Sequence, residues 1–161
     1  LLTEKDQEVF RALWLEATQA APSAFLLSPE EIEALPGTDI ASQLASGGCW
    51  GLFHADQLAA FAVLKRCAPR RLNHVADLGP VVTRPAFQGC GYGKALLLHL
   101  CSWAKAEGIL QIELCVDETN PAALALYQKL GFVEIGRRPR SLLIDGIIRN
   151  DLILLLCLDQ D

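Results

Sequence analysis

One segment decides the fold of this chain: Gln88-Gly89-Cys90-Gly91-Tyr92-Gly93. It follows residues 78–83, whose β-branched content predicts a strand, and it precedes residues 94–107, a leucine-rich run that predicts a helix ending at Gly108. The first N–H groups of a helix have no partner within the helix, and glycines allow a ligand to approach the backbone closely. We therefore expect this segment to bind a phosphate group at the start of the helix.

Two common nucleotide-binding motifs do not fit the segment. A P-loop needs Gly, four residues, Gly-Lys and then Ser or Thr, whereas Gln88 stands at the first glycine position and Ala95 follows Lys94. A dinucleotide fingerprint needs the spacing Gly-x-Gly-x-x-Gly, whereas the glycines here stand at 89, 91 and 93. On these residues alone, a glycine turn without any ligand stays open as an alternative.

The segment resembles the acetyl-CoA loop of the GNAT superfamily of N-acetyltransferases, which has the pattern Gln/Arg-x-x-Gly-x-Gly/Ala. A second segment, Asn120 to Phe132, resembles the Asn-x-x-Ala-x-x-x-Tyr-x-x-x-Gly-Phe signature of the same family. The two segments agree with the family in order, spacing and context, and the resemblance spans about residues 50–157. It implies an enzyme that uses acetyl-CoA as co-substrate.

The rest of the pattern predicts an α/β (α+β) fold in a single domain, residues 1–161. Asp145-Gly146 stands between two apolar runs and predicts a type I′ hairpin. As the resemblance also implies, we expect a GNAT-like mixed, largely antiparallel central sheet of about six to seven strands flanked by about four helices. Periodicity and turn signals predict helices near 3–17, 28–34, 94–107 and 120–130, and strands near 1–3, 49–53, 58–64, 73–83, 110–116, 132–135 and 152–158. Residues 142–144 and 147–148 are the two arms of the predicted hairpin.

The composition limits the class of protein. A length of 161 residues with 52% hydrophobic residues suits one domain with a packed core. The apolar runs are too short or too interrupted for us to expect a membrane span, and we expect no secretory signal. A net charge of −5 argues against nucleic-acid binding, which usually requires a basic surface. The six cysteines lack zinc-ligand spacing, so we expect a reduced, cytoplasmic protein with no metal, no membrane partner and no nucleic-acid partner.

The loop and the strand before it supply the expected cofactor contacts. The backbone N–H groups of residues 89–94 are expected to hold the diphosphate, and the resemblance implies that the main chain of residues 81–83 faces the pantetheine arm. Simpler interpretations stay open: ordinary buried strand residues at 81–83, a solvated lysine at 94 and a helix N-cap at Asn120. The full set expected to contact acetyl-CoA is Val81, Val82, Thr83, Gln88, Gly89, Cys90, Gly91, Tyr92, Gly93, Lys94, Asn120, Ala123 and Tyr127.

The resemblance places Tyr127 near the thioester sulfur. A phenol with an ordinary pKa of about 10 is protonated at neutral pH and can donate to a thiolate, so Tyr127 is the expected general acid. The alternative is a core aromatic residue of an amphipathic helix. No motif fixes the general base: Asp77 is the first candidate, with Glu113 and His74 as alternatives, and His54 is expected on the surface in a turn.

The expected activity is transfer of the acetyl group of acetyl-CoA to a primary amine of a small molecule or amino acid. Direct transfer is expected because no Cys/His pairing suggests an activated nucleophile. Two alternatives stay open, a protein or peptide N-acetyltransferase and a non-catalytic CoA-sensing module. The basic run 137–140 is interpreted as a solvated turn or as an anion contact. Many relatives pair, so a homodimer is also an expectation.

Overall fold

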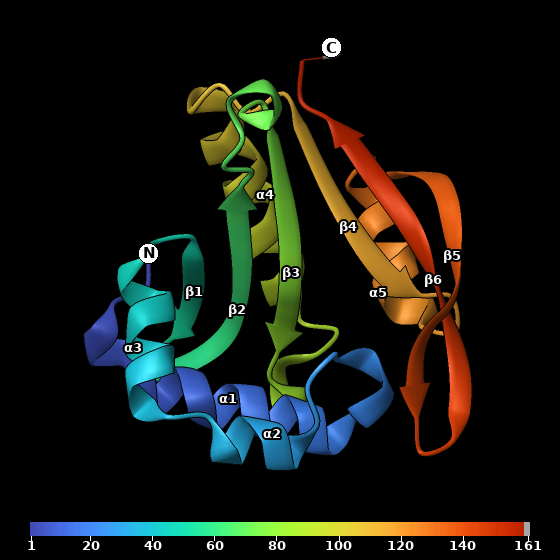
Figure 1. Cartoon of the computed structure of the whole chain (residues 1–161). Helices are drawn as coiled ribbons and strands as arrows, with labels where there is room; N and C mark the ends of the chain where they lie inside the picture. The colour runs from blue at the N-terminus through green and yellow to red at the C-terminus, as the bar shows by residue number, and fades with distance from the viewer. Residues whose placement is uncertain (160–161) are drawn as a thin grey trace. The chain divides into compact units, whose positions relative to one another are not determined.

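A computed structural model describes residues 1–159, and the chain forms two compact units. The N-terminal unit contains Leu1–Leu64 and Pro80–Leu97, and the C-terminal unit contains Lys65–Gly79 and the chain from Leu98 onward. Three elements begin in one unit and end in the other: β2 (Gln57–Arg66), β3 (Val75–Thr83) and α4 (Tyr92–Ala106) (Figure 1). The glycine-rich segment lies in the N-terminal unit, and the Asn120–Phe132 segment lies in the C-terminal unit.

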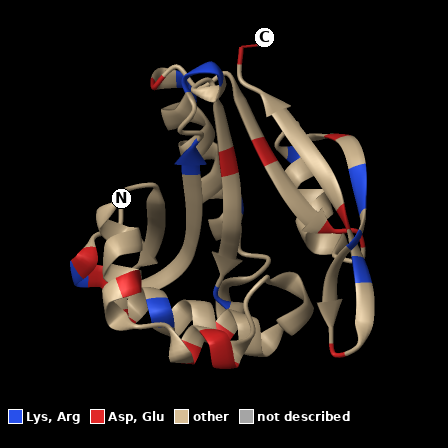
Figure 2. Ribbon diagram, viewed as in Figure 1, with Lys and Arg blue, Asp and Glu red and all other residues tan. Residues whose placement is uncertain are grey.

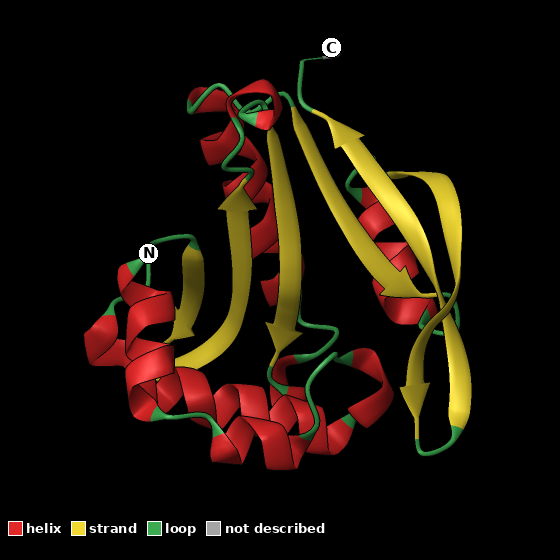
Figure 3. Ribbon diagram, in the orientation of Figure 1, coloured by secondary structure: helices red, strands yellow, loops and turns green. Residues whose placement is uncertain are grey.

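Six strands form a mixed sheet in the order β1-β2-β3-β4-β6-β5 (Figure 3). Strand β1 pairs antiparallel with β2, and β6 pairs antiparallel with both β4 and β5, whereas β3 and β4 are parallel. The prediction of a mixed, largely antiparallel sheet is confirmed. The strands not yet delimited are β1 (Cys49–His54), β4 (Gln111–Asp117), β5 (Val133–Ile144) and β6 (Ile147–Cys157).

The described residues contain five α-helices, one more than expected. The helix predicted near 28–34 does end before Pro36-Gly37, at Ala34. The additional helix, α3, begins at Gly37, because Ile40 and Leu44 lie one helical turn apart and are both buried in the core. None of the helices within residues 1–159 has the length and apolar character that crossing a membrane requires. Besides α4, the helices are α1 (Gln7–Ala20), α2 (Pro29–Ala34), α3 (Gly37–Ala45) and α5 (Pro121–Lys129).

The core of the N-terminal unit fixes the end of β3. Phe10 and Trp14 of α1 pack on Phe61 of β2, with the centroids of the Phe10 and Phe61 rings 4.4 Å apart. Val82 of β3 belongs to the same buried cluster. The end of β3, which leads into the glycine-rich segment, is therefore held by packing in this core.

Leu2 was expected to belong to a strand, but it lies outside the strands of the sheet. Its N–H donates to the carbonyl of Cys49, the first residue of β1, at 2.8 Å.

The C-terminal unit confirms one predicted turn and corrects another. Asp145 (φ 50°) and Gly146 (φ 77°) both adopt the left-handed conformation that a type I′ hairpin requires, and they join β5 to β6. The basic run 137–140 is not a turn, because it lies inside the long strand β5. The register between β5 and β6 shifts between Arg138 and Leu142, and Arg140 has a φ of 56°. The basic run therefore lies at an irregularity in the β5–β6 pairing.

Candidate functional site

The glycine-rich loop runs from a short 3₁₀ helix, Pro85–Phe87 (η4), to the first turn of α4. Gly89 (φ 76°) and Gly91 (φ 87°) both lie in the left-handed region, and no atom outside their immediate neighbours lies within 4 Å of where a Cβ would stand. The first helical bond of α4 runs from the Ala95 N–H to the Gly91 carbonyl at 2.9 Å. The amides of residues 92–94 therefore have no acceptor within the helix.

Two of the loop's own polar groups are already engaged. The Cys90 N–H, which we expected to be available to a diphosphate, donates instead to the Phe87 carbonyl at 3.3 Å. The Gln88 side chain folds back, with Nε2 3.5 Å from the Thr83 carbonyl. The groups that remain for an anion are therefore concentrated at the start of α4.

Arg84 ties the end of β3 to two neighbouring elements. Its backbone N–H donates to the Ala59 carbonyl at 2.8 Å, and its Nε donates to the Leu58 carbonyl at 3.0 Å. Its Nη1 forms an ion pair with Glu16 of α1, and the Arg84 side chain is only 13% exposed. No motif singles out Arg84 in the sequence, because its partners Leu58, Ala59 and Glu16 are distant along the chain.

Three rings gather at the ends of the loop. The Tyr92 hydroxyl lies 2.6 Å from Nδ1 of His54, and the two ring centroids are 5.7 Å apart. Phe87 packs on both rings, with centroids 5.3 Å from His54 and 5.2 Å from Tyr92. We call these three residues the ring cluster. His54 is exposed, as expected, but it is bound to the loop rather than being a simple surface residue.

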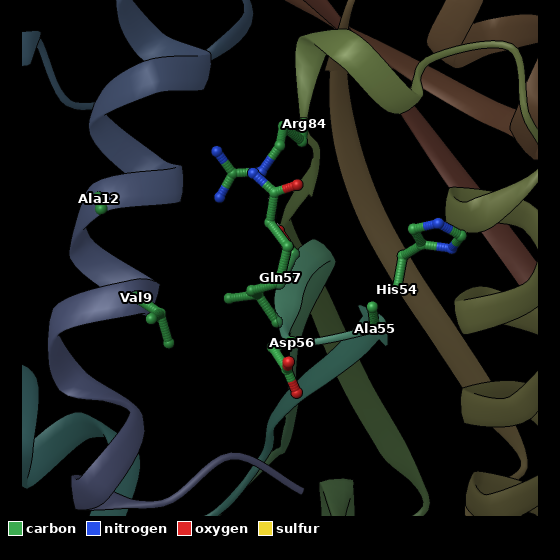
Figure 4. A pocket seen from close by; sticks show the side chains of 8 residues that line it. Val9, Ala12, His54, Ala55, Asp56, Gln57 and Arg84 are labelled. Atoms are coloured by element: carbon green, nitrogen blue, oxygen red, sulfur yellow. Dashed lines mark hydrogen bonds between the residues drawn. The ribbon is translucent and has the colours of Figure 1, made fainter.

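A shallow hollow of about 550 Å³ lies beside the ring cluster (Figure 4). Val9 and Ala12 of α1 form one wall, and the turn between β1 and β2 forms the other. Arg84 reaches into the space from the end of β3. The hollow is thus built wholly from the N-terminal unit and shares His54 and Arg84 with the surroundings of the loop.

Helix α5 carries the second sequence motif in the C-terminal unit. Asn120 is its N-cap, with Oδ1 accepting from the Ala123 N–H at 3.1 Å, and Gly131 (φ 91°) ends it. Tyr127 is 8% exposed and packs edge-on against Phe132 at 5.5 Å. Burial raises the pKa of the Tyr127 phenol to about 12. The phenol therefore keeps its proton throughout the neutral range.

The expected base, Asp77, lies beside a second carboxylate. Parallel strands β3 and β4 pair Asp77 with Glu113, and each strand carries an acidic band at that level (Figure 2). The Cys67 thiol lies 3.7 Å from Oδ2 of Asp77, and Gln111 donates to the Glu113 carboxylate. Burial, followed by the charge of Asp77, raises the pKa of the Cys67 thiol, which stays protonated and can donate. Asp77 and Glu113 were separate candidates in the sequence, and only the strand register shows that they are neighbours.

Further acidic groups line the same face of β4 and β6. Cys115 is two residues beyond Glu113, and burial, with Asp151, Asp77 and Glu113 adding to it, raises the pKa of its thiol. Asp117 stands opposite Asp151, and the latter pairs with Arg138 at 3.5 Å. Within residues 1–159 there is no group of three or more His, Cys, Asp or Glu side chains that could hold a metal ion, and all six cysteines there are free thiols.

Arg137 is not available as an anion contact, because Glu118 binds it. Its Nε and Nη2 donate to the Glu118 carboxylate at 2.6 and 2.8 Å, and the Asn150 amide donates to the same carboxylate at 2.7 Å. The hydrogen bonds from Arg137 first, and from Asn150 second, lower the pKa of Glu118 to about 2. The Arg137 side chain is 52% exposed, but its guanidinium is paired with Glu118, which argues against the anion-contact interpretation for this residue.

This pair predicts a pH-dependent contribution to stability. The pKa of Glu118 is lower in the folded state, so its stabilisation is complete above a pH of about 4.5 and is lost as the pH falls toward about 2. Glu118→Gln is expected to lower the thermal unfolding midpoint at pH 7. The difference in midpoint between the variant and the wild type should narrow steadily as the pH falls below about 4.5. Glu134→Gln, at an exposed position of β5, is the matched control. A gap that stays constant between about pH 7 and pH 3 would contradict the assignment.

The known proteins that the sequence resembles are acetyltransferases. Residues 7–132 match the sequence model of the Acetyltransferase (GNAT) family. The chain is 34% identical over 128 residues to a mycothiol acetyltransferase of Renibacterium salmoninarum, a match that covers 75% of this chain and 37% of that protein. It is 37% identical over 79 residues to a [ribosomal protein bS18]-alanine N-acetyltransferase of Salmonella typhimurium, covering 49% and 50%. The chain thus spans half or less of the length of these curated relatives.

Solved structures share the fold over nearly the whole chain. An acetyltransferase of the GNAT family from Streptococcus pneumoniae superposes with a TM-score of 0.77 at 25% identity, covering 96% of this chain and 95% of that chain. A Salmonella typhimurium protein, whose structure contains its cofactor acetyl-CoA, superposes with a TM-score of 0.84 at 17% identity, covering 98% and 91%. At such identity the second likeness concerns the fold alone.

Proposed function

Because the chain belongs to the acetyltransferase (GNAT) family, we propose that it transfers the acetyl group of acetyl-CoA to a primary amine of a small molecule or amino acid. The observation that carries this proposal is the loop itself, in which two left-handed glycines lead into a helix N-terminus. Bound acetyl-CoA supplies an activated thioester. Residues 1–161 are proposed to act as one acetyltransferase domain in the cytoplasm.

The diphosphate is proposed to lie against the amides at the start of α4. The amides of Tyr92, Gly93 and Lys94 have no acceptor within the helix, and the space beside Gly89 and Gly91 is open. Each charge contact with a helix N-terminus contributes about 0.3–1 kcal/mol, and Lys94 adds a positive charge nearby. These features fit a diphosphate, since an anion there would meet unbonded donors without meeting a side chain.

The remaining cofactor contacts are proposed from the family resemblance. Val82 buries its side chain in the core, so only its main chain, with that of Val81 and Thr83, is offered to the pantetheine arm. Asn120 and Ala123 are bonded to each other through Oδ1 and the amide N–H. The Nδ2 group of Asn120 is therefore the part of this pair that is proposed to donate to a carbonyl of the arm.

Tyr127 is proposed to donate to the departing sulfur. An ordinary thiol has a pKa near 8.5, well below the value of about 12 that burial gives the phenol, so complete proton transfer to a thiolate is uphill. The phenol is therefore proposed to act as a hydrogen-bond donor that stabilises the negative charge developing on sulfur, and the released thiolate takes its proton from solvent.

Asp77 is proposed as the general base, with Glu113 as its neighbour. A protonated amine must lose a proton before it can attack the thioester, and a carboxylate is a suitable acceptor. Two adjacent carboxylates on paired strands also attract a cationic ammonium group, which favours an amine acceptor. The Cys67 thiol donates to Asp77 and helps to hold the carboxylate in place.

Replacing the base should slow the reaction without weakening acetyl-CoA binding. Asp77→Asn is expected to lower kcat by about 100-fold, the lower end of what a general base contributes, and high pH should restore part of the rate because more amine is then neutral. Asp145→Asn is the control, since asparagine also tolerates the left-handed conformation at that hairpin position. A full loss in Glu113→Gln with an unchanged Asp77→Asn would transfer the role to Glu113.

Release of CoA thiol across a panel of amines tests the function as a whole. Small amines, amino acids and peptides are each supplied with acetyl-CoA as donor. Turnover with a small amine supports the proposal, whereas turnover only with peptides favours the protein N-acetyltransferase alternative. Binding of CoA without turnover on any amine favours a CoA-sensing module. Homodimerisation stays a prediction, which sedimentation of the purified protein would test.

A further inference from the structure

The loop that is proposed to hold the diphosphate is bounded by two aromatic residues. Phe87 is the last residue before the loop, and Tyr92 is the first residue of α4. Their ring centroids are 5.2 Å apart, so the two ends of the loop contact each other directly. Between them lie the two glycines in the left-handed region, which have no side chain to fix them.

His54 joins both ends of the loop to a different part of the chain. It is the last residue of β1 and pairs with Gln57 across the tight turn of Ala55 and Asp56. Its ring packs on Phe87 at 5.3 Å, and its Nδ1 lies 2.6 Å from the Tyr92 hydroxyl. A single side chain on a short hairpin thus contacts the residue before the loop and the residue after it.

The hairpin that carries His54 is itself well anchored. The register of β1 and β2 shifts between Leu52 and Phe53, so that β2 has one extra residue, Ala59, at this level. The Ala59 carbonyl accepts the N–H of Arg84, which directly precedes η4. The turn, the end of β3 and the loop are therefore connected by backbone bonds as well as by the ring cluster.

We infer that His54 is a positioning residue for acetyl-CoA, holding the glycine loop through Tyr92 and Phe87 in the conformation that presents the amides of α4. This inference rests on the proposed function. His54 need not touch the cofactor, because it acts through its hydrogen bond to the Tyr92 hydroxyl and its packing on Phe87. The role is therefore to order the loop before the ligand arrives.

Such ordering should affect binding rather than chemistry. A loop with two left-handed glycines has many conformations available, and the entropy lost on ordering it weakens ligand binding unless other contacts have already restricted it. The His54 contacts described above are with Tyr92 and Phe87 and involve neither Tyr127 nor Asp77, so loss of the His54–Tyr92 bond should leave the proposed acid and base unchanged. The signature is a change in KM for acetyl-CoA with little change in kcat.

A double-mutant cycle on His54 and Tyr92 tests the inference. His54→Phe keeps a ring against Phe87 but removes the hydrogen bond, and Tyr92→Phe removes the same bond from the other side. A single hydrogen bond corresponds to about a two- to tenfold change in an equilibrium, so each variant should raise KM for acetyl-CoA and Kd for CoA by about that factor. The double variant should be no worse than either single variant, because both remove one shared contact.

Two further variants separate positioning from general stability. His54→Asn places an amide group near the position of Nδ1, and should restore part of the affinity. His99→Gln, at an exposed position of α4, is the matched control and should leave KM unchanged. Additive losses in the double variant, or a KM in His54→Phe equal to that of the wild type, would overturn the inference. If the wild type itself does not bind CoA in calorimetry, it is the proposed function that fails.

Discussion

Replacing Gly91 with asparagine is expected to weaken CoA binding by at least about 100-fold, the loss that follows when a side chain occupies the diphosphate position and displaces its amide contacts. Gly91 has a φ of 87°, and asparagine is among the few residues that tolerate this conformation. No atom outside its immediate neighbours lies within 4 Å of the added Cβ, so the branch point of the new side chain stands in open space. Calorimetric titration with CoA measures the loss.

Gly108→Asn is the control for this prediction. Gly108 has a φ of 74° and equally open surroundings, but it lies beyond the far end of α4 from the loop. Both variants should unfold at similar temperatures because both carry the same backbone strain. Equal CoA affinities in the two variants would show that the space beside Gly91 is not where the diphosphate lies.

Replacing Tyr127 with phenylalanine is expected to lower kcat by about 100-fold while KM for acetyl-CoA changes less than about threefold. Phenylalanine preserves the edge-on packing against Phe132 and removes only the hydroxyl. The loss should appear in the chemical step, because the hydroxyl is proposed to interact with charge that develops on sulfur. Steady-state kinetics with a saturating amine provide the measurement.

The choice of acetyl donor sharpens the test of Tyr127. When the thiol of a thioester has a lower pKa, its thiolate leaves more easily and needs less stabilisation from a hydrogen-bond donor. The kcat of the Tyr127→Phe variant should therefore come closer to that of the wild type when such a thioester replaces acetyl-CoA. An unchanged kcat with acetyl-CoA would make Tyr127 a core aromatic residue, which its 8% exposure alone would explain.

The sequence was most informative where local chemistry determines the structure. A glycine that ends a helix, an N-cap asparagine followed by proline, and an Asp-Gly turn each act within a few residues, so Gly108, Asn120 and Asp145 all have the predicted local roles. The sheet class followed from the same turns. Helix α3 was missed because Pro36-Gly37 resembles a helix end, whereas tertiary burial of Ile40 and Leu44 favours a new helix start there.

The features that the sequence could not supply depend on contacts between distant segments. His54 and Tyr92 are far apart along the chain, and their bond depends on how β1 and β2 pair and on where the register shifts. Asp77 and Glu113 become neighbours only through the register of β3 and β4. The pairing of Arg137 with Glu118 could not be predicted either, because Glu118 follows β4 and reaches Arg137 only through the pairing of β4 with β6 and of β6 with β5. No periodicity or motif encodes these pairings.

Calorimetric titration of the unmodified protein with CoA tests the central claim most directly, since every proposed role depends on a diphosphate at the start of α4. We predict saturable binding with one CoA per chain, and much weaker binding of pantetheine, which lacks the diphosphate. No heat of binding at millimolar CoA, or equal affinity for pantetheine, would contradict the account.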